Sequence, residues 1–308
     1  MIKALQCGML AAALIMTAVM QAESASTAQA NAALQAGEAD KALALLNSLP
    51  QSAEVHNLRC RVDLTLQQWN NAVDECQKAV NMDGGSSDYH LWLGRALGEK
   101  ADRASFLSAY SLAKRVRSEF EAAVKANPRN AAALADLGEY YYSAPGIVGG
   151  GDDKAESVAR DLDGVDATRA RELRGRIAES RKDYGTAERE LKAALAGSSH
   201  PAYQWMTLAS FYRNRQRWTD MEAAVQNGAR AAQQDKKAAV ALFDGASLLI
   251  KARRNSILAA RMLEEYLAGT NKTEEAPAFA AYTLLARLKA GLGDKAGARQ
   301  ERDAALSL

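Results

Sequence analysis

Residues 205–218 read WMTLASFYRNRQRW, and this stretch decides the fold. An apolar-small pair that ends at Ala209 is followed by an aromatic residue, a polar turn and Trp218. The same pattern occurs once before, because 34 residues separate Gly175 from Ala209 and Tyr184 from Trp218. A fixed period of this length is the sequence signature of a protein built from structural repeats.

Further copies of the pattern begin near Cys60, Leu93, Leu137 and Leu285, and weaker ones lie over residues 30–46 and 236–269. Each copy has apolar residues at i, i+3, i+4 and i+7 in two successive runs, which predicts two amphipathic helices joined by a turn. Small residues at the crossing of the two helices are expected to face small residues on the return helix.

The chain has 308 residues, 48% of them hydrophobic and only 6% aromatic. A formal net charge of +2 is too small for a general affinity for nucleic acid.

The repeated pattern resembles the tetratricopeptide repeat (TPR), whose signature is W-x2-L-G-x2-Y…A-x3-F…A…P at a period of 34 residues. The resemblance implies an all-α, right-handed α-solenoid of about seven to eight helical hairpins over residues 23–308. Met221 stands where the family places an alanine, and only the copy ending at Pro128 has the family's proline. Two copies carry insertions: a long return helix is expected at about residues 101–126, and a glycine-rich loop between helices at residues 143–151.

Residues 1–22 have the composition of a secretory signal peptide. Lys3 supplies a positive charge, residues 10–20 form an apolar run of eleven residues, and Ala22 precedes the expected cleavage site. The run is short for a transmembrane helix, which needs roughly 20 apolar residues. We therefore expect an exported, periplasmic protein, with an uncleaved anchor helix as the alternative.

Apart from Cys7 in the predicted signal peptide, the cysteines of the chain are Cys60 and Cys76, which lie sixteen residues apart on two helical patterns. Because an oxidising compartment favours disulfides, the pair is a candidate bridge. The alternative is two buried thiols that pack as small hydrophobic side chains.

In TPR proteins, certain positions of the first helix of each hairpin line a concave groove. The resemblance implies that this groove holds Arg61, Arg95, Arg176 and Arg287 at one repeated position, with Arg213, Glu139, Tyr142 and Tyr203 nearby. Arginine binds carboxylate groups in a bidentate manner. We therefore expect a protein or peptide partner with acidic or C-terminal carboxylate groups, unless the arginines form only a solvated face.

The glycine-rich loop and the long helix before it also resemble exported repeat proteins related to the T component of TRAP transporters. A partner contact on this loop would involve Pro145, Ile147 and Val148. The triple glycine at residues 149–151 lacks the preceding strand and the following Gly-Lys-Ser/Thr of a phosphate-binding loop.

No combination of nucleophile, base and orienting group stands out in the sequence, and His56, His90 and His200 are far apart. We therefore predict a non-enzymatic periplasmic scaffold for protein–protein interaction, without cofactor or metal and without nucleic acid as a partner. The alternative is a periplasmic transport accessory, similar to the TRAP T component, that binds a small apolar ligand or a solute-binding protein.

Overall fold

The computed structural model describes residues 26–307, and over this range the chain consists of helices and short connections without a β-strand. The helices pair into eight antiparallel hairpins, which confirms the predicted all-α solenoid. The predicted signal peptide, residues 1–22, lies outside the described residues. Within residues 26–307, no helix is both long enough and apolar enough to cross a membrane.

Each hairpin contains a first helix and a return helix. The first hairpin consists of a helix over residues 26–35 and α2 (Ala39–Asn47). The others are α3 (Ala53–Thr65) with α4 (Trp69–Met82), α5 (Ser87–Ala101) with α6 (Phe106–Ala126), α7 (Ala131–Ser143) with α8 (Asp152–Asp163), α9 (Ala167–Ser180) with α10 (Tyr184–Gly197), α11 (Pro201–Asn214) with α12 (Trp218–Gln234), α13 (Val240–Ala252) with α14 (Ser256–Ala268), and α15 (Ala278–Gly291) with α16 (Lys295–Leu306).

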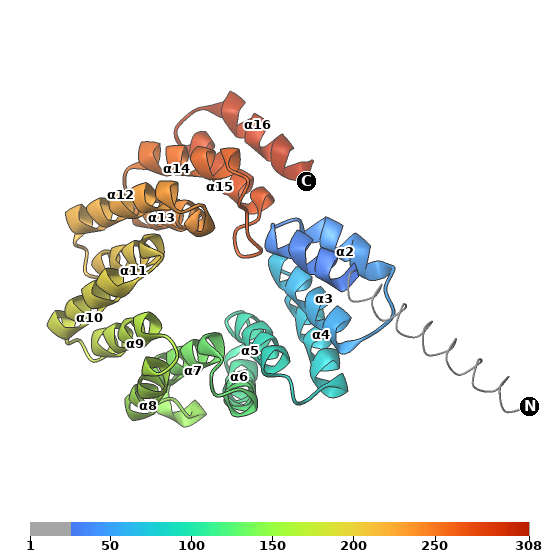
Figure 1. Cartoon of the computed structure of the whole chain (residues 1–308). Coiled ribbons are helices and arrows are strands. Elements are labelled where there is room, and N and C mark those ends of the chain that lie inside the picture. Colours follow the sequence, from blue (N-terminus) through green and yellow to red (C-terminus); the bar gives the residue numbers. More distant parts are fainter. Residues whose placement is uncertain (1–25, 308) are drawn as a thin grey trace, which may run out of the picture.

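The hairpins stack in chain order and curve into an almost closed ring (Figure 1). Successive first helices contact one another, as α3 does with α5, α5 with α7, α7 with α9 and α11 with α13, so these helices form the inner wall. The core divides into three clusters that follow one another along the sequence, as expected when each repeat buries its apolar face against its neighbours.

The turn between the two helices has a residue with positive φ within two positions of the end of the first helix in six of the eight hairpins, and the α13–α14 turn has a second one, Asn255. One residue after the first helix has a positive φ, a common way to end a helix. These residues are Gly37, Gln67, Lys182, Gln216, Arg253 and Gly293. The other two hairpins are those in which the sequence predicts insertions: the α5–α6 connection has no residue with a positive φ, and in α7–α8 the positive φ values occur later, at Gly149 and Gly151.

The inserted segments differ in part from expectation. The return helix α6 begins at Phe106 rather than near residue 101, because α5 continues to Ala101 and a turn follows. With 21 residues, α6 is still longer than α4, which has 14. The glycine-rich loop joins Ser143 to Asp152 and contains one short 3₁₀ turn, Gly146–Val148.

Glycines at two helix crossings face large side chains of the return helix, although Gly175 also lies beside Ala187, as expected. A Cβ on Gly94 would lie 2.5 Å from the ring of Phe120, and one on Gly175 would lie 2.7 Å from Leu191. A glycine on the first helix therefore provides the space for a large side chain from the return helix. The packing is complementary in size.

Candidate functional site

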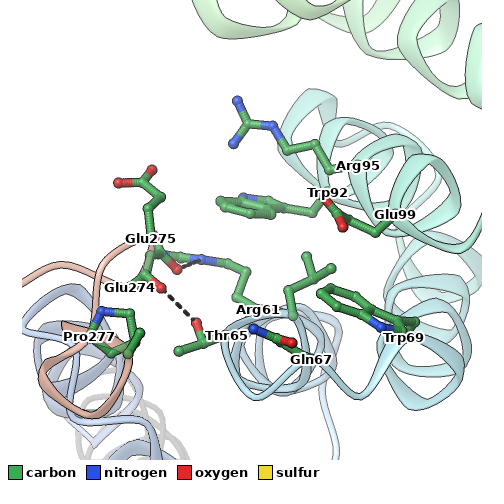
Figure 2. A pocket seen from close by; sticks show the side chains of 12 residues that line it. Arg61, Thr65, Gln67, Trp69, Trp92, Arg95, Glu99, Glu274, Glu275 and Pro277 are labelled. Carbon is green, nitrogen blue, oxygen red and sulfur yellow. Dashed lines mark hydrogen bonds and ion pairs between the residues drawn. The ribbon is translucent and has the colours of Figure 1, made fainter. Parts of the chain in front are cut away.

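The ring is closed by the segment between α14 and α15, which lies against the N-terminal hairpins (Figure 2). The Arg61 Nε and Nη2 atoms donate to the two carboxylate oxygens of Glu274 at 3.0 and 2.7 Å. Thr65 Oγ1 donates to the main-chain oxygen of Glu274 at 3.2 Å. The Arg61 and Glu274 side chains are only 10% and 14% exposed, so this ion pair joins the ends of the solenoid in a largely dry environment.

Two further contacts strengthen this seam between the ends. Arg61 Nη1 donates to Asn31 Oδ1 at 3.0 Å, which links the first helix to the same guanidinium group. Gly37 has a φ of 75°, and a Cβ on it would lie 2.9 Å from the main-chain oxygen of Thr273. Glycine therefore suits both the turn conformation and the close approach of the C-terminal loop.

A cavity of about 450 Å³ lies on the inner side of the seam. The Trp92 ring lies between two guanidinium groups, with Arg61 Cζ 4.9 Å and Arg95 Cζ 4.7 Å from the ring centroid. Figure 2 shows Glu274 directed at Arg61, and Glu275 directed toward the Arg95 side of the ring. Cation–π contacts of this kind fix the orientation of the indole ring.

A second cavity, of about 710 Å³, lies between α7, α9, α11 and α13 and includes Glu275 of the seam loop. Its polar lining comprises Glu139, Tyr142, Arg169, Glu172, Arg176, Tyr203, Gln204 and Glu275. Glu275 lines both cavities, so the seam loop reaches into the middle of the inner wall.

The structure brings six of the eight predicted groove residues to these cavities. Arg61 and Arg95 line the first, and Glu139, Tyr142, Arg176 and Tyr203 line the second. Arg213 and Arg287 line neither cavity. Arg213 donates to the neighbouring Asn214 side chain at 3.1 Å, and Arg287 is exposed on α15.

The arginines on the inner wall already have carboxylate partners within the chain. In addition to the Arg61–Glu274 pair, Arg95 Nε donates to Asp136 at 2.6 Å, and Arg176 Nη1 lies 3.4 Å from Glu179. The expected row of arginines is therefore present, but its charge is neutralised internally.

Three carboxylates that line the second cavity, Glu139, Glu172 and Glu275, have no cationic ion-pair partner among residues 26–307, and neither has Asp244 on α13, whose charge interacts with that of Glu275. Glu172 accepts a hydrogen bond from Thr207 Oγ1 at 2.8 Å. Of these four, only Glu139 is at a position that the repeat pattern assigns to the groove. Glu172 precedes Arg176 by one helical turn on α9, and this spacing could have identified it; Glu275 lies outside the repeat pattern.

Confinement within the ring raises the pKa of three of these carboxylates. Burial, with the nearby charge of Glu275, raises the pKa of Asp244 to about 6. Burial raises the pKa of Glu139, and the charge of Asp136 adds to the effect. For Glu275, burial and the adjacent Glu274 have the same effect on the pKa. When these carboxylates are ionised, the inner wall carries more negative than positive charge.

Comparison with solved structures identifies the architecture. A TPR protein of Thermus thermophilus matches with a TM-score of 0.53 and 19% identity, over 61% of this chain and 98% of that one. The chain has the tetratricopeptide repeat fold. A chain of the APC/C hetero-tetramer Cut9-Hcn1 (17% identity; 84% of this chain, 48% of that one) has a TM-score of 0.49. PilW, a widely conserved type IV pilus biogenesis factor (15% identity; 73% and 97%), has a TM-score of 0.45.

No protein-family model matches the sequence, and no curated protein matches it. Among the described residues, no group of three or more His, Cys, Asp or Glu side chains is arranged to hold a metal ion. The fold of this TPR chain is established by its structure. The features that bear on its function are the side chains of the inner wall and of the outer surface.

The glycine-rich loop of the TPR solenoid is packed against α6. Val148 is buried, and its main-chain oxygen accepts hydrogen bonds from Tyr140 at 2.9 Å and from Arg117 at 3.3 Å. A Cβ on Gly150 would lie 1.8 Å from the main-chain oxygen of Ala144. The glycines therefore permit close packing of the loop. Of the three residues expected to contact a partner, Pro145 and Ile147 are exposed, whereas Val148 is inaccessible.

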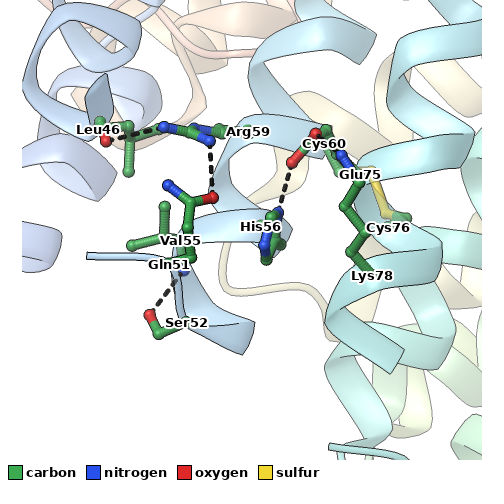
Figure 3. A network of polar contacts seen from close by, with 10 residues as sticks. All are labelled: Leu46, Gln51, Ser52, Val55, His56, Arg59, Cys60, Glu75, Cys76 and Lys78. Atoms are coloured by element: carbon green, nitrogen blue, oxygen red, sulfur yellow. Dashed lines mark hydrogen bonds and ion pairs between the residues drawn. A yellow bond between two sulfur atoms is a disulfide. The ribbon is translucent and has the colours of Figure 1, made fainter. Parts of the chain in front are cut away.

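Cys60 and Cys76 form a disulfide between α3 and α4, with Cα atoms 5.2 Å apart (Figure 3). A second link joins the same two helices, because His56 Nδ1 lies 2.6 Å from Glu75 Oε2. Burial alone would raise the pKa of Glu75, but hydrogen bonds from His56 and Lys78 lower it overall. The helix that carries Arg61 is therefore fixed to its partner immediately beside the seam.

Proposed function

We propose that this chain is an exported protein-interaction scaffold that binds an extended polypeptide segment against the inner wall of its ring. The observation that carries the proposal is the closure of eight hairpins into a ring whose inner wall has two polar cavities that share Glu275. Such a preformed concave surface suits extended partners, since stacked repeats create long binding faces. The composition of residues 1–22 supports export to the periplasm.

The charges of the inner wall favour a basic segment over an acidic one. Arg61, Arg95 and Arg176 would have to leave internal carboxylates before they could bind carboxylates of a partner. Glu139, Asp244 and Glu275 form no internal ion pair within residues 26–307. The neighbouring Tyr142 and Tyr203 offer aromatic faces to lysine and arginine side chains. The geometry therefore favours a partner with several lysines or arginines, instead of the acidic partner expected from the sequence.

The alternative of a transport accessory for a small apolar ligand has no supporting observation in these cavities. The second cavity is lined mainly by charged and hydroxyl side chains, and in the first the two tryptophans lie beside Arg61, Arg95, Glu99, Glu274 and Glu275. An apolar ligand would leave these groups desolvated, and burying polar groups without partners is costly.

Replacing Glu139 and Glu275 together by glutamine is expected to weaken binding of a lysine-rich ten-residue peptide by about tenfold, because two carboxylates that face the bound chain lose their charge. Fluorescence anisotropy at low salt measures the affinity. The matched control is Glu54→Gln with Glu265→Gln, which removes the same charge on α3 and α14 at positions that line neither inner cavity. Tighter binding of an acidic peptide of equal length would instead support the arginine groove and contradict the basic partner.

Binding of the same basic peptide is expected to strengthen between pH 5 and pH 7. Asp244, whose pKa is raised to about 6 by burial and Glu275, is largely protonated at the lower pH and ionised at the higher one. The folded chain binds this proton more tightly than the unfolded chain, so the contribution of Asp244 to the free energy of unfolding falls as pH rises toward 6. Asp244→Asn should flatten the pH dependence of the affinity. An unchanged pH profile in that variant would show that Asp244 does not face the peptide.

Photo-crosslinking in cells is expected to identify the partner. A photoreactive residue at Tyr142 or Tyr203 is expected to capture it, whereas one at Ile257 on α14, outside both inner cavities, serves as the control. Capture from the control position alone would contradict binding at the inner wall.

A further inference from the structure

The first turns of α6 expose apolar side chains that neither the core nor the inner wall uses. Phe106 is 87% exposed and Leu107 is 82% exposed, the highest values among the large apolar side chains of the described residues. Tyr110 is 38% exposed and lies one helical turn after Phe106, so the three side chains share one side of the helix. They belong to the extra length that makes α6 longer than the other return helices.

Basic residues flank these side chains in the sequence, and Lys114 lies against the Tyr110 ring. Between residues 100 and 118, the sequence contains Lys100, Arg103, Lys114, Arg115 and Arg117, with Asp102 as the single acid. Arg103 pairs with Glu99, and Arg117 lies 3.4 Å from Glu121. Within residues 26–307, Lys114 and Arg115 have no carboxylate partner: Lys114 Nζ lies 4.7 Å from the centroid of the Tyr110 ring, and Arg115 donates to Gln77.

We call Phe106, Leu107, Tyr110, Lys114 and Arg115 the basic-apolar tip. None of the five lines either inner cavity, so the tip could be occupied while the ring holds a partner. Along the helix the apolar side chains come first and the cations about two turns later, with a tyrosine between; Lys114 lies on the side of Leu107, and Arg115 points away from Phe106. This is the order in which side chains meet a bilayer, from acyl chains through the interface to lipid phosphates.

We propose that the basic-apolar tip docks this chain reversibly on an anionic lipid surface. Two large apolar side chains are too little surface for a specific protein interface, which covers roughly 800 Å² on each partner. They suffice for shallow insertion at the membrane interface when cations nearby are attracted to anionic headgroups. This inference does not depend on the identity of the partner held in the ring.

Vesicle co-sedimentation tests the proposal with the full chain. Vesicles of phosphatidylcholine with about 30% phosphatidylglycerol are expected to bind the protein, and Phe106→Ser with Leu107→Ser should lower the partition coefficient at least about tenfold. The matched control is Ile257→Ser with Leu306→Ser, which removes side chains that are 70% and 80% exposed elsewhere. Lys114→Glu with Arg115→Glu should also lower partition at least about tenfold and remove its dependence on phosphatidylglycerol.

A second measurement reports on the tip directly, so binding through any other segment of the chain does not obscure the result. A tryptophan at Phe106 (F106W) should be quenched by brominated lipids, while a tryptophan at Ile257 (I257W) should not. Equal quenching at both positions, or equal partition of the tip and control variants, would overturn the proposal. Concentration-dependent self-association that is lost in the tip variant without vesicles would also overturn it, since the tip would then bind a second copy.

Discussion

Replacing Glu274 by glutamine is expected to open the ring. Arg61 would keep its charge in a largely buried position without a counter-charge, and removing one member of a buried ion pair typically costs about 3–5 kcal/mol. Because the seam consists of one loop and few contacts, the loss should appear as release of residues 269–277 rather than as global unfolding. Small-angle X-ray scattering should show a larger radius of gyration, and hydrogen exchange in that loop should accelerate.

Glu275→Gln is the matched control, because it removes the neighbouring carboxylate, which forms no ion pair among residues 26–307 and does not contact Arg61 in Figure 2. In a double-mutant cycle, the variant with both Arg61→Met and Glu274→Met should have a more stable seam than the single Glu274→Met variant, in which Arg61 has lost its partner. If Glu274→Gln and Glu275→Gln give the same scattering curve and the same exchange rates as the unaltered chain, the ion pair does not hold the ring closed.

Removing the disulfide is expected to destabilise the N-terminal hairpins by about 3 kcal/mol, as estimated from the entropy of closing a loop of about fifteen residues. The chain with Cys60→Ala and Cys76→Ala should unfold at lower urea concentration in its N-terminal part. Counting free thiols with and without reductant establishes that the bridge exists. Hydrogen exchange measured at increasing urea concentrations then distinguishes unfolding of the N-terminal hairpins from unfolding of the rest of the solenoid.

The disulfide and the seam should be coupled, because Cys60 and Arg61 are adjacent on α3. Loosening α3 relative to α4 is therefore expected to accelerate exchange in residues 269–277 as well. His56→Gln provides a comparison, since it weakens the link to Glu75 while leaving the bridge in place. Identical urea transitions in the oxidised and cysteine-free chains would contradict a stabilising role for the bridge.

The sequence was sufficient to predict the helical hairpins and their number. A repeat such as Gly175–Ala209 depends on contacts within a hairpin and with the next one, and these contacts join residues close together in the chain. The same local periodicity correctly placed Arg61, Arg95 and Arg176 on the inner wall. It also identified the two irregular hairpins, although the start of α6 at Phe106 depended on how far α5 continues.

The charge available on the inner wall was decided only by the tertiary structure. Arg61 and Glu274 are 213 residues apart, and no repeat relates them; they meet because the successive small rotations between hairpins bring the two ends of the solenoid together. Likewise, Asp136 neutralises Arg95 from the neighbouring hairpin. Local periodicity fixes which side of a helix a residue occupies, but the sum of many inter-hairpin rotations fixes what it faces, and that sum cannot be read from any single repeat.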